Sequence, residues 1–294
     1  MQSQQRLQTA DQISSIVHGE RWFLDGFSVI GAPGGVLTRM CNMSRAKVLL
    51  ARLKEQGIQA TYTHLFVRAT ALALARCPDA HQMVCGYRRL RPARVDIGLS
   101  VAGQTSFAPV LVIEDAFAKK LPDLVDFLKE QIPKTREKEA RDLAGMRKTG
   151  WLVPFGFLRR AILRLLGNLF WFRRKLVGTF QVTVLRDADT VTPLLFYSGA
   201  ALGVGAVRDR VVAHLGQPVV APTAVLSMTF DHRTLDGKRT TDLLATVCSI
   251  LEGDELFAET GVGAVQDLVL GSAKKVPGLE VEVLDTATSA NCTK

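Results

Sequence analysis

The sequence predicts an α/β protein folded as one compact unit. Helical and strand-like patterns alternate along most of the 294 residues, 47% of the residues are hydrophobic, and neither an internal repeat nor a Pro/Ser-rich linker divides the chain. A chain of this length can bury a sizeable core without disulfides or metals. We therefore expect helices packed against a sheet.

Periodicity and turn signals predict the elements of the first half. After a loosely structured stretch, a helix that Ser44 can cap continues to Gly57. A second helix, capped by Thr61 or Thr63, extends to Arg76, and its nearly continuous apolar composition predicts burial on most sides. The elements expected next are strands at 95–102 and 108–113 and a helix at about 121–139.

The second half predicts further strands and one clear amphipathic helix. The expected elements are strands near 179–185, 200–207 and 219–230, a helix at about 237–251, and an edge strand at 279–284. The polar residues 285–294 predict a disordered tail.

Composition and charge exclude several classes of protein. The net charge is +9, but no zinc finger, RNP-like aromatic motif or basic heptad accompanies it, so we expect no nucleic-acid partner. The N-terminus lacks the apolar segment of a signal peptide, and no segment approaches the ~20 apolar residues that span a bilayer. The cysteines are odd in number and scattered, which predicts a cytoplasmic protein without a disulfide framework or metal site: Cys41, Cys77, Cys85, Cys248 and Cys292.

One segment combines residues that suit acid–base chemistry. A β-rich run ends at His232, and a charged turn with Asp236 and Gly237 then leads into a helix. Histidine is well suited to removing a proton near neutral pH, and the end of a strand holds such a group rigidly. Asp236 can brace the turn. The pattern predicts a general base at His232.

This segment resembles a known family signature. Asp231 to Gly237 reads D-H-R-T-L-D-G and resembles the D-H-R-x-x-D-G signature of the acyltransferase (E2) subunits of 2-oxoacid dehydrogenase complexes, which is related to the H-H-x-x-x-D-G motif of chloramphenicol acetyltransferase. Four further segments resemble that family in order and spacing: Ala69–Ala75 with Pro78, Val95–Ala102, Pro109–Ala116 and Gly178–Thr183. The resemblance covers roughly residues 40–140 and 176–252. It implies a chloramphenicol acetyltransferase-like two-layer fold with a mixed sheet flanked by helices.

The resemblance implies a role for three residues. His232 matches the catalytic histidine, which takes a proton from a thiol or hydroxyl as that group attacks an acyl thioester. Thr183 matches the serine whose hydroxyl stabilises the oxyanion, and Asp236 matches the residue that holds the histidine turn through an ion pair. In the family the histidine and the hydroxyl come from neighbouring subunits. We therefore expect a homotrimer that uses coenzyme A, as acyl-CoA, or an acyl carrier protein.

The chain departs from the family in three respects. It shows no D-K-A lipoylation motif, so we expect no lipoyl attachment site in this chain and a thioester on CoA or a separate carrier as donor. The arginine-rich N-terminal helix of the family is not recognisable in residues 1–40, which leaves the partner of Asp236 unknown. The expected domains are an N-terminal extension (1–39), an acyltransferase domain (40–284) with a basic amphipathic insertion (143–177), and the tail (285–294).

The third departure is that insertion. Between Leu143 and Arg186 the sequence has nine Lys or Arg residues and no acid, interleaved with Trp and Phe, which is typical of an interfacial helix. Residues 151–175 could dock on an anionic membrane or an acidic partner, making the protein peripheral to the membrane. Alternatively, their apolar face packs against the neighbouring subunit.

The leading prediction is a stand-alone E2-like acyltransferase. The alternatives are a non-catalytic trimeric scaffold and a membrane-recruited acyltransferase that acts on a lipid-like alcohol. The remaining histidines share no metal-ligand spacing and are interpreted as structural or surface residues: His18, His64, His81 and His214. The glycines at 199, 203 and 205 are better explained by strand packing than by a phosphate loop, because no Lys-Ser/Thr follows.

Overall fold

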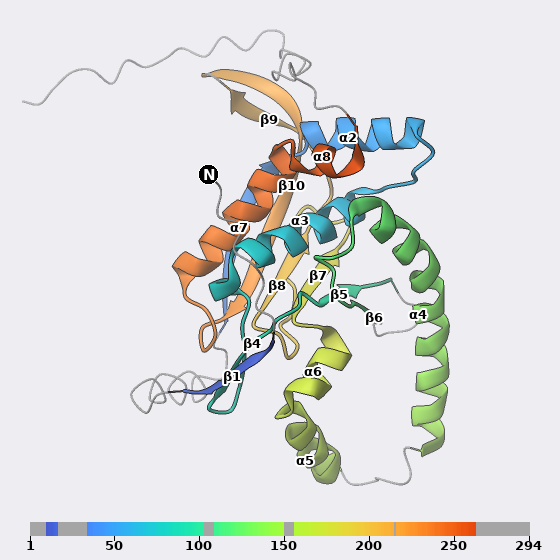
Figure 1. Ribbon diagram of the computed structural model, residues 1–294, viewed down its shortest axis with the longest axis vertical. Helices are drawn as coiled ribbons and strands as arrows, with labels where there is room; N and C mark the ends of the chain where they lie inside the picture. Colours follow the sequence, from blue (N-terminus) through green and yellow to red (C-terminus); the bar gives the residue numbers. More distant parts are fainter. Residues whose placement is uncertain (1–9, 17–33, 103–108, 150–155, 215, 263–294) are drawn as a thin grey trace, which may run out of the picture.

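The main sheet is mixed, as the sequence predicts. The computed structural model describes residues 10–16, 34–102, 109–149, 156–214 and 216–262. In spatial order the sheet contains β2 (Gly34–Asn42), β10 (Gln217–Asp231), β8 (Ala200–Val204), β7 (Phe180–Val184), β5 (Ile97–Ser100) and β6 (Val110–Ile113), and β9 (Arg208–His214) pairs with β10 (Figure 1). Strands β5, β7 and β8 run parallel, and the other pairings are antiparallel.

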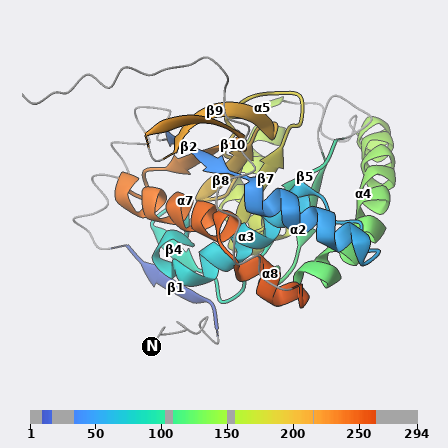
Figure 2. The same ribbon diagram turned by 90° about the horizontal axis from the view of Figure 1, so that it is seen from above.

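Helices cover one face of this sheet. They are α2 (Ser44–Glu55), α3 (Tyr62–Arg76) and α7 (Gly237–Glu252), and the short α8 (Glu255–Thr260) follows α7 (Figure 2). Alternate residues of β10, Leu226, Met228 and Phe230, enter the core that α7 closes with Leu243 and Val247. The expected burial of α3 is confirmed, since every residue from Leu65 to Ala75 is buried.

Two helix starts differ in how they are capped. Thr61 caps α3 as expected: its backbone N–H and hydroxyl lie 3.0 and 2.8 Å from His64 Nδ1, which forms a capping box. Burial lowers the pKa of His64. Ser44 is instead the first residue of α2, and Met43 occupies the cap position without a side-chain bond.

A second, small sheet lies beside the main one and was not expected from the sequence. Its strands, in order, are β1 (Gln12–Ser15), β4 (Arg88–Arg91) and β3 (Met83–Cys85), and the 3₁₀ turn η1 (Pro78–Ala80) precedes β3. The expectation of a loosely structured beginning is therefore wrong for β1 and for β2, which starts at Gly34.

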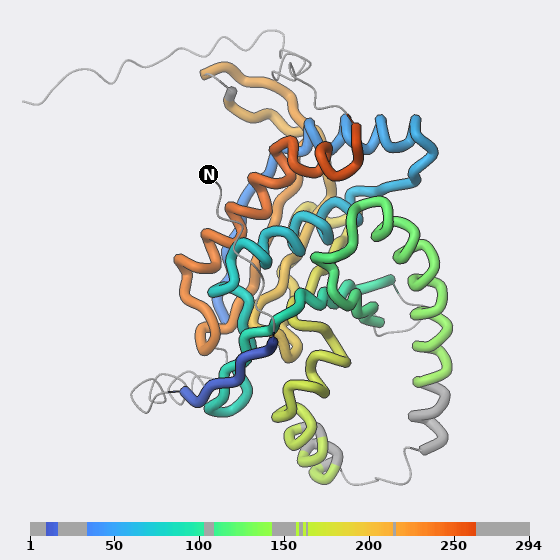
Figure 3. Tube along the Cα trace, in the orientation of Figure 1, coloured from blue at the N-terminus to red at the C-terminus, as the bar shows by residue number. Residues whose placement is uncertain are grey.

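The connection between β6 and β7 is helical. The helix expected at 121–139 continues as α4 (Leu121–Thr149), with Pro133 inside it. The amphipathic segment forms two helices, α5 (Gly156–Gly167) and α6 (Phe170–Val177), which lie at one end of the molecule (Figure 3). No described helix is both long and apolar enough to cross a bilayer. The strand expected at 279–284 and the tail lie outside the described residues.

Candidate active site

The turn after β10 positions His232. The backbone N–H of Asp231 donates to Gly199 O at 3.0 Å, and the carbonyl of Asp231 accepts the N–H groups of Thr234 and Leu235 at 2.8 and 2.9 Å. These bonds close the turn immediately after the strand. His232, which they enclose, is exposed in the single chain, and its ring lies edge-on at 4.7 Å from the ring of Phe230.

The two charged neighbours of His232 brace the turn. The Arg233 guanidinium donates to Asp231 through Nε, at 3.0 Å from both carboxylate oxygens, and through a terminal nitrogen at 2.7 Å. The backbone N–H of Arg233 adds a bond of 2.8 Å to Asp231 Oδ1. The hydrogen bond to Asp231 raises the pKa of Arg233. This fork fixes the backbone on both sides of the imidazole.

Asp236 stabilises the start of α7. Its carboxylate accepts the backbone N–H of Arg239 at 2.7 Å as a helix cap, and the Arg239 guanidinium lies 3.5 Å away. Both side chains are more than half exposed, so the ion pair itself contributes little to the stability of the fold. Within the chain the residue expected to brace the histidine turn therefore acts as a cap on the helix that follows it.

Thr183 lies on β7 beside a second hydroxyl. Thr183 Oγ1 is 3.0 Å from Ser100 Oγ on the neighbouring strand β5, and both residues are half-buried. On its other side Thr183 pairs with Gly203. A Cβ at Gly203 would lie 2.2 Å from the carbonyl oxygen of Val191, so this glycine is required by the close approach of the 188–193 backbone, as strand packing predicts.

A single chain does not bring His232 and Thr183 together. Thr183 is in register with Gly203 of β8, which in turn is opposite Ser227 of β10. His232 follows Ser227 by five residues, or roughly 16 Å along the strand, and β10 lies two strands away from β7, or roughly 10 Å. The predicted meeting of the two groups can therefore occur only between chains, and it stays a prediction.

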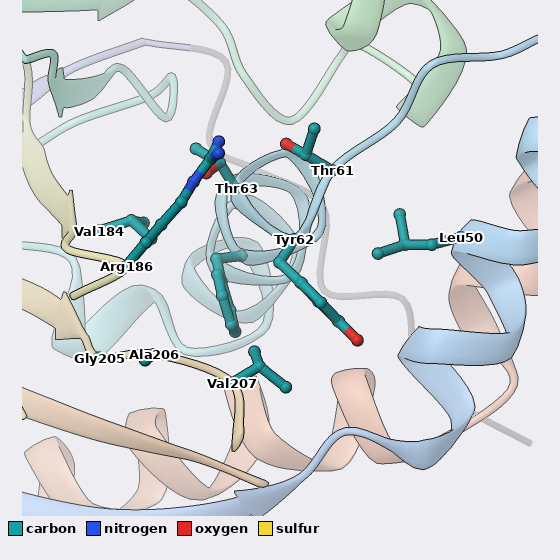
Figure 4. A pocket seen from close by; sticks show the side chains of 10 residues that line it. Leu50, Thr61, Tyr62, Thr63, Val184, Arg186, Gly205, Ala206 and Val207 are labelled. Carbon is teal, nitrogen blue, oxygen red and sulfur yellow. The ribbon is translucent and has the colours of Figure 1, made fainter. Parts of the chain in front are cut away.

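A pocket of about 260 Å³ opens on the helix-covered side of the sheet, the face opposite the Thr183 side chain. Its lining residues are Leu50, Thr61, Tyr62, Thr63, Phe66, Val184, Arg186, Gly205, Ala206 and Val207. Arg186 extends toward Thr63, while the Tyr62 ring points toward Val207 (Figure 4). Burial, with a smaller contribution from Asp209, raises the pKa of Tyr62. A guanidinium, two threonine side chains and the start of a helix suit an anionic group.

The insertion packs against β3 and the segment before β8 through Arg173, which the sequence interpretation missed. The Arg173 guanidinium, on α6, donates to the carbonyls of Gly167 and Val84 and lies 5.0 Å from the centre of the Tyr197 ring. Burial is the main cause that lowers the pKa of Arg173, and the nearby charge of Arg233 adds to it. Ser100 was missed as well. Neither residue carries a sequence signal, because both are placed by contacts between segments distant in sequence.

The other singled-out residues have structural contacts. His81 is buried, its Nε2 lies 2.7 Å from Thr179 Oγ1, and desolvation lowers the pKa of His81 to about 4. His18 lies outside the described residues. Among the described residues, no group of three or more His, Cys, Asp or Glu could hold a metal ion.

Comparison with known proteins identifies related sequences. Residues 28–147 and 178–258 match the family model "2-oxoacid dehydrogenases acyltransferase (catalytic domain)". The dihydrolipoyllysine-residue succinyltransferase component of the 2-oxoglutarate dehydrogenase complex is 38% identical in Haemophilus influenzae and 23% in Escherichia coli K12, each over 201 residues that cover 68% of this chain and 42% of the relative. The chain thus spans less than half the length of these relatives.

Solved structures share the fold. The cubic core of the pyruvate dehydrogenase multienzyme complex aligns with a TM-score of 0.60 at 18% identity, covering 81% of this chain and 91% of that chain. A chloramphenicol acetyltransferase aligns with a TM-score of 0.51 at 13% identity, covering 82% of this chain and 99% of that chain. The predicted fold, a mixed sheet flanked by helices, is confirmed. The family match omits residues 148–177, which contain α5 and α6.

Proposed function

We propose, from the premise that this chain belongs to the 2-oxoacid dehydrogenase acyltransferase (catalytic domain) family, that it transfers an acyl group between a CoA or carrier-protein thioester and a thiol or hydroxyl acceptor. The observation that carries the proposal is the exposed imidazole of His232 on a turn that the Asp231–Arg233 fork braces at the end of a strand. A rigidly held and accessible imidazole is what general-base catalysis requires.

The reaction follows from these groups. His232 removes the proton from the acceptor S–H or O–H, and the acceptor attacks the thioester carbonyl carbon. The hydroxyl of Thr183 donates to the resulting oxyanion. When the tetrahedral intermediate collapses, the carbon–sulfur bond to the carrier breaks, and the leaving thiolate takes the proton back from the imidazolium. The names of the relatives indicate a dihydrolipoyl thiol, carried on another protein or domain, as one acceptor.

Ser100 positions the hydroxyl of Thr183. At 3.0 Å the two side chains share one hydrogen bond. If the Ser100 hydroxyl donates this bond, the proton of Thr183 is left to point at the oxyanion. We assign Ser100 as a positioning residue.

The proposed functional unit is a homotrimer with shared sites. His232 and Thr183 lie toward opposite ends of the sheet in one chain, so a complete site needs His232 from one chain and Thr183 from its neighbour. A ring of identical head-to-tail contacts closes naturally around a threefold axis. The similarity to the cubic core is consistent with such an assembly.

The pocket at Arg186 is the proposed site for the phosphate-bearing part of coenzyme A. Val184, the residue after Thr183, lines it, and because successive strand residues face opposite sides of the sheet, the pocket lies on the face opposite the Thr183 hydroxyl. The Arg186 guanidinium can form paired hydrogen bonds with a phosphate, whereas an acyl chain has no oxygen atoms to accept them. Arg186→Gln should raise the KM for acyl-CoA while changing kcat little.

The central test compares His232→Ala with the wild type. Transfer from acetyl-CoA and succinyl-CoA to dihydrolipoamide is followed by release of free CoA. Loss of a general base should slow turnover by about a hundredfold or more. His214→Ala is the matched control, because His214 belongs to β9 at the far end of β10.

The outcomes separate the proposal from its alternative. Equal rates for wild type and His232→Ala would exclude the imidazole as the base. An intact oligomer that transfers neither acyl group, to dihydrolipoamide or to a panel of alcohols, would instead favour the non-catalytic scaffold.

A further inference from the structure

Helix α5 exposes an apolar stripe to solvent. The exposed fractions of Phe157, Leu158, Ile162 and Leu165 are 66, 41, 40 and 69%. On a helix with 3.6 residues per turn, these four positions fall within one face roughly 140° wide. A stripe of this kind ordinarily packs against a protein core, yet here the rest of the described chain leaves it exposed.

The position of α5 explains why this face stays exposed. Among the described elements, α5 packs extensively only against α6. The two helices lie at one end of the molecule, at the opposite end from α2 and β9 (Figure 1). On α6, Trp171 and Leu176 are 61 and 40% exposed and add apolar surface.

The charged residues around this face are all basic. The segment from residue 143 to residue 186 has nine basic residues and no acid. Arg173 and Arg174 are used within the fold, since they donate to Val84 O and to the Asp11 and Asp96 carboxylates. Arg164 and Lys175 are exposed and remain available to an anionic partner.

We propose that α5 docks on the surface of an anionic lipid bilayer, with its apolar stripe at the boundary between headgroups and acyl chains. An exposed apolar stripe combined with basic residues and Trp is the arrangement of helices that lie in the membrane interface. An acidic protein would satisfy the charges, but a bilayer accommodates four exposed large apolar side chains as well. The docking is independent of the proposed acyl transfer and places the enzyme, not its chemistry, at a membrane.

Vesicle binding by the full chain tests the inference. Sedimentation with phosphatidylglycerol-rich vesicles should show binding that high salt weakens, and neutral phosphatidylcholine vesicles should bind far less. Ile162→Ser combined with Leu165→Ser should weaken binding about tenfold or more. Arg164→Gln and Lys175→Gln should each weaken it about fivefold, the usual contribution of one basic residue at such a surface.

Controls separate docking from folding and assembly. Leu194→Ser combined with Val211→Ser removes two side chains that are 84 and 61% exposed and should leave vesicle binding unchanged. Soluble acyl transfer and oligomer mass should also be unchanged in the α5 double variant. The inference is overturned if the wild type binds anionic and neutral vesicles equally or not at all. It is also overturned if the α5 variant dissociates the oligomer, because the stripe is then a subunit contact, or if an acidic carrier protein binds α5 and vesicles do not.

Discussion

At the scale of single residues, two hydroxyls on neighbouring strands define the expected oxyanion site. Thr183 retains the donor that the mechanism needs, but its methyl group restricts the rotation of its side chain. The bond to Ser100, 3.0 Å long, selects one orientation of that side chain. The pair can be tested by removing each hydroxyl separately.

Thr183→Val keeps the shape of the side chain and removes only the donor. We expect kcat to fall by about a hundredfold or more, because one oxyanion donor usually contributes about 3–4 kcal/mol to transition-state stabilisation. Thr183→Ser should restore the rate, and Ser100→Ala should lower kcat by a smaller factor with little effect on KM. Steady-state transfer from acyl-CoA measures all three. A wild-type rate in Thr183→Val would remove this residue from the mechanism.

His81 predicts a dependence of stability on pH. Its pKa in the folded protein is about 4, compared with an ordinary value of 6.5, because the ring is buried. Between these values the unfolded chain binds a proton that the folded chain does not, so the free energy of unfolding rises with pH across this window. Above pH 6.5 the ring is neutral in both states and does not lower stability. By pH 5, protonation of His81 in the unfolded chain lowers the free energy of unfolding by about 2 kcal/mol.

The measurement for His81 is urea unfolding at pH 5 and pH 7. His81→Gln can keep a bond to Thr179 without titrating, so its stability should change less between the two pH values than that of the wild type. An identical change in both proteins would show that His81 is protonated in the fold at pH 5.

At the scale of elements, Arg174 attaches α6 to the main sheet. The Arg174 guanidinium donates to Asp96, which is only 2% exposed and precedes β5, and to Asp11, which precedes β1. The second carboxylate oxygen of Asp96 accepts the backbone N–H of Asp115 at 2.9 Å. The insertion therefore supplies the cation that neutralises a carboxylate buried within the family fold.

Arg174→Ala should destabilise the protein by about 3 kcal/mol, because it leaves the Asp96 carboxylate buried and without its ion partner. The neighbouring change Lys175→Ala, on an exposed side chain, should alter stability by less than about 0.5 kcal/mol. Chemical denaturation followed by circular dichroism compares the two. Equal stabilities would mean that water replaces the guanidinium at Asp96.

The spacing of apolar residues along the sequence predicted α2, α3, α7 and the central strands. Their apolar residues recur at helical or strand spacing, because one face of each element packs in the core. Strands β2 and β9 were missed because five of the nine β2 residues are exposed and, among the described strands, β9 pairs only with β10. The helix expected to end at Glu139 continues to Thr149 because its residues remain strong helix formers after Pro133.

At the scale of the whole molecule, the sheet separates the two groups of the expected site. The sequence predicts that His232 and Thr183 cooperate, but only strand register shows that one chain holds them far apart. Ser100 and Arg173 could not be predicted from the sequence, since their contacts join residues 83 and 89 positions apart. The pocket at Arg186 likewise combines residues from four separate parts of the chain.

Mixed oligomers test whether sites are shared. His232→Ala and Thr183→Val chains, each inactive alone, should regain about a quarter of the wild-type activity after unfolding and refolding together in equal amounts, because about one interface in four then pairs an intact histidine with an intact threonine. The same chains refolded separately and then mixed serve as the control. Absence of recovery in verified mixed oligomers would contradict a shared site.

Because α6 is attached to the rest of the fold, the insertion cannot be deleted as an independent unit. Excising residues 151–175 would discard Arg173 and Arg174 together with α5, so the truncated chain would lose the hydrogen bond to Val84 on β3 and the counter-ion of Asp96. Such a truncation would confound loss of a lipid contact with damage to the scaffold. A variant without this segment would need compensating changes at both places.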